Sequence, residues 1–96
     1  MYLHLGQEIV VNQNDIVAIF DMDTATISKH TRDFLKKAEE KKIVFNISDN
    51  IPNSVVVCTI MGSEVVYISQ ISSQTLYKRM NFLDIYSQDK SHKEAK

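Results

Sequence analysis

Apolar residues gather in six short stretches of the chain, and these stretches are rich in the branched and aromatic side chains that favour β-strands. The predicted strands are residues 2–5, 9–11, 16–20, 43–47, 55–60 and 64–68. Residues 12–15, Asn-Gln-Asn-Asp, are expected to join the second and third strands as a hairpin, because asparagine and aspartate tolerate tight turns. Gly62 is expected to turn a second hairpin between the last two strands.

Between the third and fourth predicted strands, apolar side chains recur every three or four residues, which is the spacing of one helical face. These side chains are Ile27, Phe34, Leu35 and Ala38. The spacing predicts a helix over about residues 25–41. Side-chain oxygens of Asp23, Thr24 or Thr26 can accept a hydrogen bond from the backbone amides of its first turn.

A second, short helix is predicted over residues 73–80, where Ser72 or Ser73 can cap the first turn. This order of elements indicates an α+β fold with a small, mostly antiparallel sheet that the long helix covers on one face. The valine runs at 55–57 and 65–66 offer apolar side chains to both faces of that sheet. We therefore expect the subunit to bury the second face by assembling into a homo-oligomer.

Residues 1–80 are expected to form a single domain, and residues 81–96 a C-terminal extension with a charged, flexible tail. The extension begins with large apolar side chains, which seldom stay together in water. They are Phe82, Leu83, Ile85 and Tyr86. We expect them to dock on a neighbouring subunit.

The composition is that of an ordinary globular protein, with 44% hydrophobic and 24% charged residues. The single cysteine, Cys58, excludes an internal disulfide and a cysteine-rich zinc site. No apolar run approaches the roughly 18 residues of a membrane span, and the N-terminus lacks the pattern of a secretory signal. These features predict a soluble, cytoplasmic protein with no membrane partner.

An apolar strand that ends in an Asp-x-Asp motif, Asp21 and Asp23, resembles the first motif of haloacid-dehalogenase-type phosphatases. That chemistry also needs a lysine and an acidic pair on further parallel strands, and no acidic pair follows at the end of a later predicted strand. We interpret the two aspartates as the end of a strand and a helix cap. His4, His30 and His92 lack the spacing of metal ligands. The sequence therefore predicts neither an enzyme nor a bound metal or cofactor.

Charge is distributed unevenly, although the net charge is only −1. Residues 1–28 carry four acids and no lysine or arginine, whereas residues 29–42 carry six cations and three acids. Three of these cations share one helical stripe, which can contact successive phosphates of a nucleic acid. They are Lys29, Arg32 and Lys36. The alternative is an ordinary solvated helix face, on which Asp33 and Glu40 pair with nearby cations.

Several segments, taken in order, resemble the RemA/RemB family of bacterial regulators of extracellular-matrix (biofilm) genes. They are Leu5-Gly6, residues 10–19, residues 38–44, residues 55–59, Thr75 and Lys78-Arg79. The opening Met-Tyr-x-His-x-Gly and the long strand-to-helix segment are closest to the RemB branch. The resemblance spans roughly residues 2–80 and implies a compact α+β subunit that assembles into a ring-like homo-oligomer and binds promoter DNA.

The resemblance also implies DNA contacts through arginines at two places, and neither place has an arginine here. One position is Asp15, and the other is the loop of residues 49–54, where Ile51 and Pro52 stand. Because a carboxylate repels phosphate, this contact surface does not carry over from the family.

Two hypotheses follow from these observations. In the first, an oligomeric transcription regulator binds DNA through the helix stripe, and Lys78 and Arg79 assist. In the second, an oligomerising interaction module supports matrix-gene regulation without touching DNA, for example by pairing with a related, basic regulator.

Overall fold

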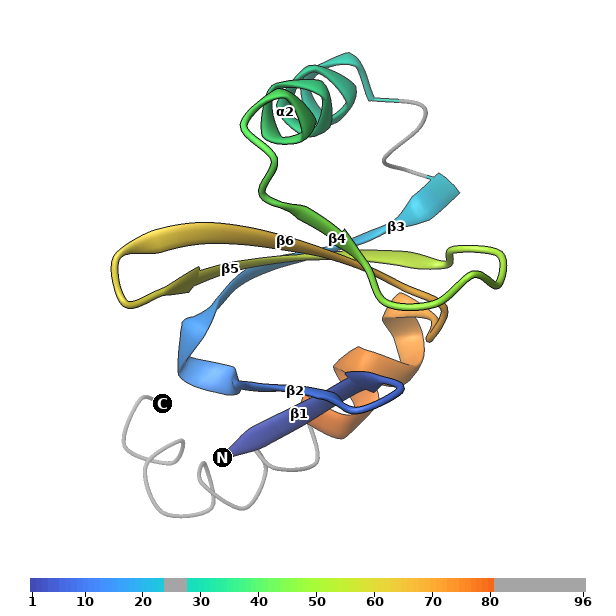
Figure 1. Ribbon diagram of the computed structural model, residues 1–96. Coiled ribbons are helices and arrows are strands. Elements are labelled where there is room, and N and C mark those ends of the chain that lie inside the picture. The colour runs from blue at the N-terminus through green and yellow to red at the C-terminus, as the bar shows by residue number, and fades with distance from the viewer. Residues whose placement is uncertain (24–27, 81–96) are drawn as a thin grey trace, which may run out of the picture.

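The structure, a computed structural model, describes residues 1–23 and 28–80 of the 96-residue chain. Figure 1 shows three layers: a helix, a four-stranded sheet, and a two-stranded ribbon that lies beside a second helix. The elements are β1 (Tyr2–Gly6), β2 (Ile9–Asn12), the 3-10 helix η1 (Gln13–Asp15), β3 (Ile16–Asp21), α2 (Lys29–Glu40), β4 (Val44–Asn46), β5 (Ser54–Ile60) and β6 (Ser63–Ser69). Residues 73–80 form the second helix.

The four-stranded sheet has the order β3-β5-β6-β4, and β1 pairs with β2 in the ribbon. Among the described pairs, only β4 and β6 run parallel. The prediction of an α+β fold with mostly antiparallel strands is confirmed. The predicted β5–β6 hairpin is confirmed as well, and it turns at Met61 and Gly62 with φ values of 51° and 83°. Two positive φ angles are what a two-residue hairpin loop of this kind requires, and glycine adopts such angles without strain.

The segment of residues 12–15 does not make a hairpin. β2 pairs with β1 and β3 pairs with β5, so the segment carries the chain from the ribbon into the four-stranded sheet. The Asn12 side chain accepts a hydrogen bond from the Asn14 amide at 2.9 Å, which starts the 3-10 turn. The predicted hairpin is wrong because turn-forming side chains specify a change of direction and do not specify which strands pair.

Helix α2 begins later than the sequence pattern predicts. Ser28 is extended and caps the helix, because its hydroxyl accepts a hydrogen bond from the Thr31 amide at 3.4 Å. The predicted start near residue 25 and the predicted cap at Asp23 are therefore wrong. Met22 and Asp23 are themselves helical, and the Asp23 amide donates to the Asp21 carboxylate at 2.9 Å, so Asp21 ends β3 and caps this separate helical start. Thr24 and Thr26 lie outside the described residues.

Strand β5 is buried on both of its faces, because successive side chains of a strand point in opposite directions. Val55 and Val57 pack toward α2, in a cluster that includes Ala38 and Val66. Val56 and Cys58 pack toward the ribbon. The buried residues of that second cluster are Leu3, Leu5, Val11, Ile19, Val56, Cys58 and Leu76.

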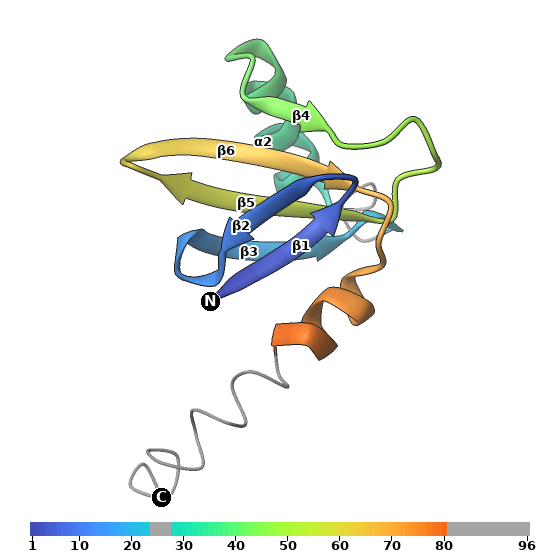
Figure 2. The ribbon, with the colours of Figure 1, turned by 60° about the horizontal axis from the view of Figure 1, so that its bottom comes forward.

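The ribbon and the 73–80 helix thus cover the second face of the sheet within one subunit, as Figures 1 and 2 show. The buried hydroxyl of Ser69 also donates to the Leu5 carbonyl at 2.6 Å and ties the sheet to the ribbon. The premise that this face needs a second subunit is therefore wrong. The strand pattern predicts two-sided burial correctly, but it does not show that the N-terminal ribbon folds over the sheet. Assembly into a homo-oligomer stays a prediction that needs other support.

The 73–80 helix begins as predicted at Ser72, whose hydroxyl accepts a hydrogen bond from the Thr75 amide at 3.1 Å. Its Leu76 is 0% exposed and packs between the sheet and the ribbon, and the Tyr77 hydroxyl donates to the Ile19 carbonyl at 2.8 Å. The helix is therefore an integral part of the second core layer.

We expect Leu76→Ala to lower the free energy of unfolding by about 2–5 kcal/mol, because it removes buried methyl groups and leaves a cavity. Urea denaturation followed by circular dichroism measures this loss. Gln74→Ala, on the exposed side of the same helix, is the matched control and should change stability by less than about 0.5 kcal/mol. Equal midpoints for the two variants would show that this helix does not contribute to the core.

Candidate nucleic-acid interface

The predicted cationic stripe lies on the outer side of α2. Ala38 anchors the opposite side in the core, and Phe34 and Leu35 are half-buried beside it. Successive residues of an α-helix are rotated by about 100° around its axis, so the packing of Ala38 in the core turns the stripe toward solvent. The exposed cations are Lys29, Arg32 and Lys36. The structure therefore brings these three predicted residues together on one accessible surface.

Acidic residues lie beside the stripe. Asp33, Lys36, Lys37 and Glu40 line one shallow hollow on the helix surface. The neighbouring carboxylates of Asp33 and Glu40 reduce the positive potential that a phosphate backbone would meet. The outer face of α2 is consequently a mixed-charge surface, which fits both interpretations that the sequence leaves open.

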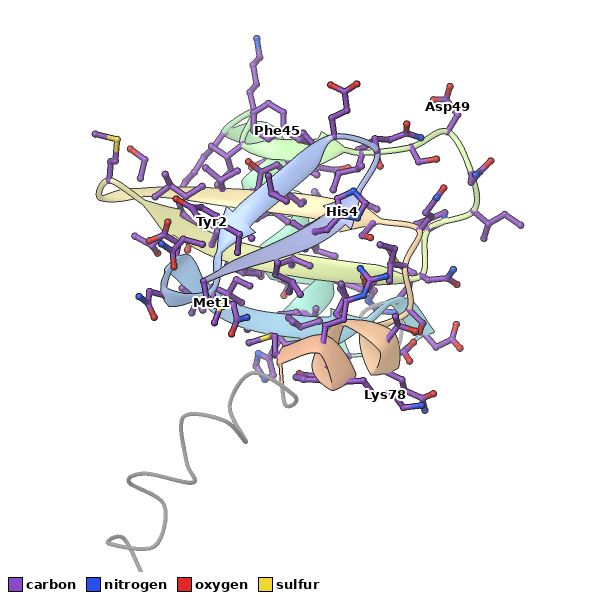
Figure 3. The ribbon with its side chains drawn as sticks, turned by 90° about the horizontal axis from the view of Figure 1, so that it is seen from below. Met1, Tyr2, His4, Phe45, Asp49 and Lys78 are labelled. Carbon is purple, nitrogen blue, oxygen red and sulfur yellow. The ribbon has the colours of Figure 1, made fainter. Side chains whose placement is uncertain are left out.

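Lys78 and Arg79 do not share that surface. Their helix packs on the ribbon side of the sheet, whereas α2 packs on the other side. Figure 3, seen from below, shows Lys78 on the 73–80 helix. The Arg79 guanidinium donates to the His4 carbonyl of β1 at 3.1 Å, so this arginine also holds the helix against the ribbon. The five predicted cations thus form two separate surfaces.

The loop before β5 is held by neutral side chains. Asn50 donates from its amide nitrogen to the Gln70 side-chain oxygen at 2.7 Å, and Asn53 donates to the Gln70 carbonyl at 2.5 Å. Between them, Ile51 is 81% exposed. This loop has no lysine or arginine to bind a phosphate, and Asp49 adds a negative charge, so its residues do not replace the missing arginines.

Both oxygens of the Asp21 carboxylate accept hydrogen bonds within the fold. One oxygen accepts from the Asp23 amide, and the other accepts from the Ser73 hydroxyl at 3.4 Å. Within residues 1–23 and 28–80, no three His, Cys, Asp or Glu side chains converge to hold a metal ion. Asp21 therefore ends β3, caps the helical residues that follow it and is joined to the 73–80 helix through Ser73.

Cys58 lies in the core and is 0% exposed. Burial away from water, together with the negative charge of Asp15, raises the pKa of its thiol to about 11. Both effects favour the neutral thiol, because the thiolate would be poorly solvated. The Cys58 side chain is thus a packing residue of the second core layer.

The sequence patterns did not predict the hollow of about 530 Å³ that opens between β2 and β4. Its lining residues are Gln7, Glu8, Ile9, Phe45, Asn46, Ile47 and Tyr67. The signal in the sequence was the pair of aromatic residues in separate predicted strands, but their proximity depends on the parallel pairing of β4 with β6.

The described chain is thus a small α+β protein with charged helical surfaces, and none of its described helices is long and apolar enough to cross a membrane. Its sequence matches the RemA-like family, described as extracellular matrix regulatory protein A-like, over residues 2–80. It is also 41% identical over 83 residues to the extracellular matrix regulatory protein B of Bacillus subtilis (strain 168), an alignment that covers 86% of this chain and 94% of that relative. The chain belongs to the RemA-like family, which confirms the resemblance.

We expect the Cys58 thiol of the folded protein to react with a disulfide reagent such as DTNB at pH 8 at least about 100-fold more slowly than an unperturbed thiol. The raised pKa lowers the thiolate fraction by about that factor, and only the thiolate attacks. Absorbance at the reagent's product band follows the reaction. The urea-unfolded protein is the control and should react at the ordinary rate. Fast labelling of the folded chain would contradict the burial of this residue.

Proposed function

We propose that this protein regulates the expression of extracellular-matrix genes as an oligomeric, DNA-binding transcription regulator without enzymatic activity. The observation that carries the proposal is the family match over residues 2–80, which spans every described element from β1 to the 73–80 helix. The relative in Bacillus subtilis carries the name extracellular matrix regulatory protein B. This name supports the matrix-regulation part of the proposal, and the DNA contact rests on the charge distribution.

In this proposal, α2 makes the DNA contact. Lys29, Arg32 and Lys36 are exposed, and the packing of Ala38 holds their side of the helix toward solvent. Each subunit offers only three such cations, so affinity requires assembly. A ring-like homo-oligomer would repeat the stripe and multiply the phosphate contacts. Lys78 and Arg79 lie on the opposite side of the sheet and would assist only by meeting a second DNA segment.

A second function is supported by a specific observation, namely that the structure places no cation at the family's arginine positions. Asp15 is an acid, and the loop that contains Ile51 and Pro52 has no lysine or arginine and exposes the apolar side chain of Ile51. These features favour an oligomerising interaction module. Such a module would support matrix-gene regulation through a related, basic regulator and would not contact DNA itself.

The salt dependence of binding separates the two functions. With the full-length protein and a fluorescent promoter fragment of a matrix operon, the first predicts a dissociation constant that rises about 40-fold between about 50 and 200 mM salt if one subunit's three cations contact phosphates. Fluorescence anisotropy measures this change. A protein–protein contact with an apolar core would show no such dependence.

A matched pair of charge reversals locates the contact. Lys36→Glu should weaken DNA binding by at least tenfold and flatten the salt dependence, whereas Lys78→Glu, the same change on the opposite side of the sheet, should have a smaller effect. The double variant Lys29→Glu/Arg32→Glu should abolish binding. Absence of binding at low salt, by protein shown to be oligomeric, would rule out the first function and favour the second.

Both functions require self-association, which has its own measurement. We expect size-exclusion chromatography with light scattering, at micromolar concentration, to give a molar mass several times the 11.0 kDa of one chain. A mass of one chain under these conditions would remove the assembly from both proposals.

A further inference from the structure

The hollow between β2 and β4 lies beside two edge strands of the described sheets. Among the described strands, β2 pairs only with β1 and β4 pairs only with β6. Each of these strands therefore presents one edge without a strand partner within the described residues, and the hollow of about 530 Å³ opens between Ile9 and Phe45. Open strand edges beside an apolar hollow are a common binding surface for another polypeptide segment.

Aromatic and aliphatic side chains form the inside of this hollow. Phe45 is 51% exposed, and its ring lies 6.1 Å from the ring of Tyr67, centroid to centroid, at a tilt of 39°. Ile9 and Ile47 complete the apolar lining, and Glu8 adds a carboxylate. A hollow of about 530 Å³ with an aromatic lining and a few polar groups can hold a few apolar side chains of another segment.

The chain itself contains a segment with matching chemistry. Beyond the described residues, four of the five positions from Phe82 to Tyr86 are large and apolar. Residues 81–96 carry three lysines and three acids, so their net charge is zero. The match with the hollow is therefore one of apolar side chains, since Ile9, Phe45 and Ile47 line it.

The position of the 73–80 helix indicates which copy supplies this segment. Arg79 bonds the His4 carbonyl of β1, so the helix lies against the ribbon, and Figure 3 shows the ribbon between Lys78 and Phe45. Phe82 follows residue 80 by only two positions, a reach of at most about 7 Å. Within one copy, the apolar segment would have to cross the ribbon before entering the hollow.

We propose that the hollow lined by Phe45 and Tyr67 receives residues 82–86 of a second copy of this chain. The proposal rests on the self-association in the proposed function and assigns it a contact. The donor segment and the receiving hollow are different surfaces, so each copy gives one segment and accepts another. Contacts of this heterologous kind close into rings when the rotation between copies allows it.

Disulfide trapping between separate copies tests the contact directly. The full-length single variants Phe45→Cys and Tyr86→Cys are mixed under mild oxidation, and the products are separated on a non-reducing gel. We expect a linked dimer in this mixture. The control mixture of Met61→Cys with Tyr86→Cys should give no such dimer beyond background, because Met61 lies at the β5–β6 turn and is 98% exposed. Cys58 is buried and stays in place in every variant.

Light scattering of a second variant pair gives an independent readout. Phe45→Glu should weaken self-association by at least about tenfold, because it puts a charge into the proposed aromatic contact. Met61→Glu adds the same charge at the turn and should leave the mass unchanged. Circular dichroism verifies that both variants fold.

Each other outcome overturns the proposal in a distinguishable way. An oligomer of unchanged mass in Phe45→Glu, with no trapped dimer, would reject this contact and leave self-association standing. A wild-type mass of one chain would reject both. A link that forms only within the double variant Phe45→Cys/Tyr86→Cys, without any dimer, would show that the segment occupies the hollow of its own copy.

Discussion

Burial of β5 on both faces is the constraint on which the rest of the structure depends. Every residue from Ser54 to Cys58 is buried, so the sheet needs an apolar layer above and below. Helix α2 supplies the first layer through Ala38, and the ribbon with the 73–80 helix supplies the second through Leu5 and Leu76. A chain of this size can satisfy both demands only by using almost all of its elements as cover.

This arrangement decides where charge can lie. The covering elements expose only their outer sides, so α2 presents Lys29, Arg32 and Lys36 to one side of the molecule, and the 73–80 helix presents Lys78 and Arg79 to the other. A duplex that meets one surface does not meet the other on the same subunit. In the proposed function, affinity for DNA would therefore depend on multivalent binding by an assembly, because one stripe of three cations gives few phosphate contacts.

The same arrangement leaves an apolar surface outside both core layers. The ribbon contains only two strands and β4 contains only three residues, so a hollow remains between them, with Phe45 half exposed. An exposed aromatic residue beside unfinished strand edges favours association with another segment. The proposed assembly is therefore supported by this hollow and not by the four-stranded sheet, both of whose faces are covered within one subunit.

Local sequence specifies the features that depend on near neighbours: the strand stretches, the hairpin at Gly62, a helix cap at Ser72 or Ser73, the cationic stripe on α2 and the family. Tertiary structure decided which distant segments meet. The contact of Ser69 with Leu5 and that of Arg79 with His4 join residues 64 and 75 positions apart. They place the ribbon over the sheet, separate the cations into two surfaces and bring β2 opposite β4. Hydrophobic period and turn chemistry act over a few residues, so they specify an element and its buried side but not the partner against which that side packs.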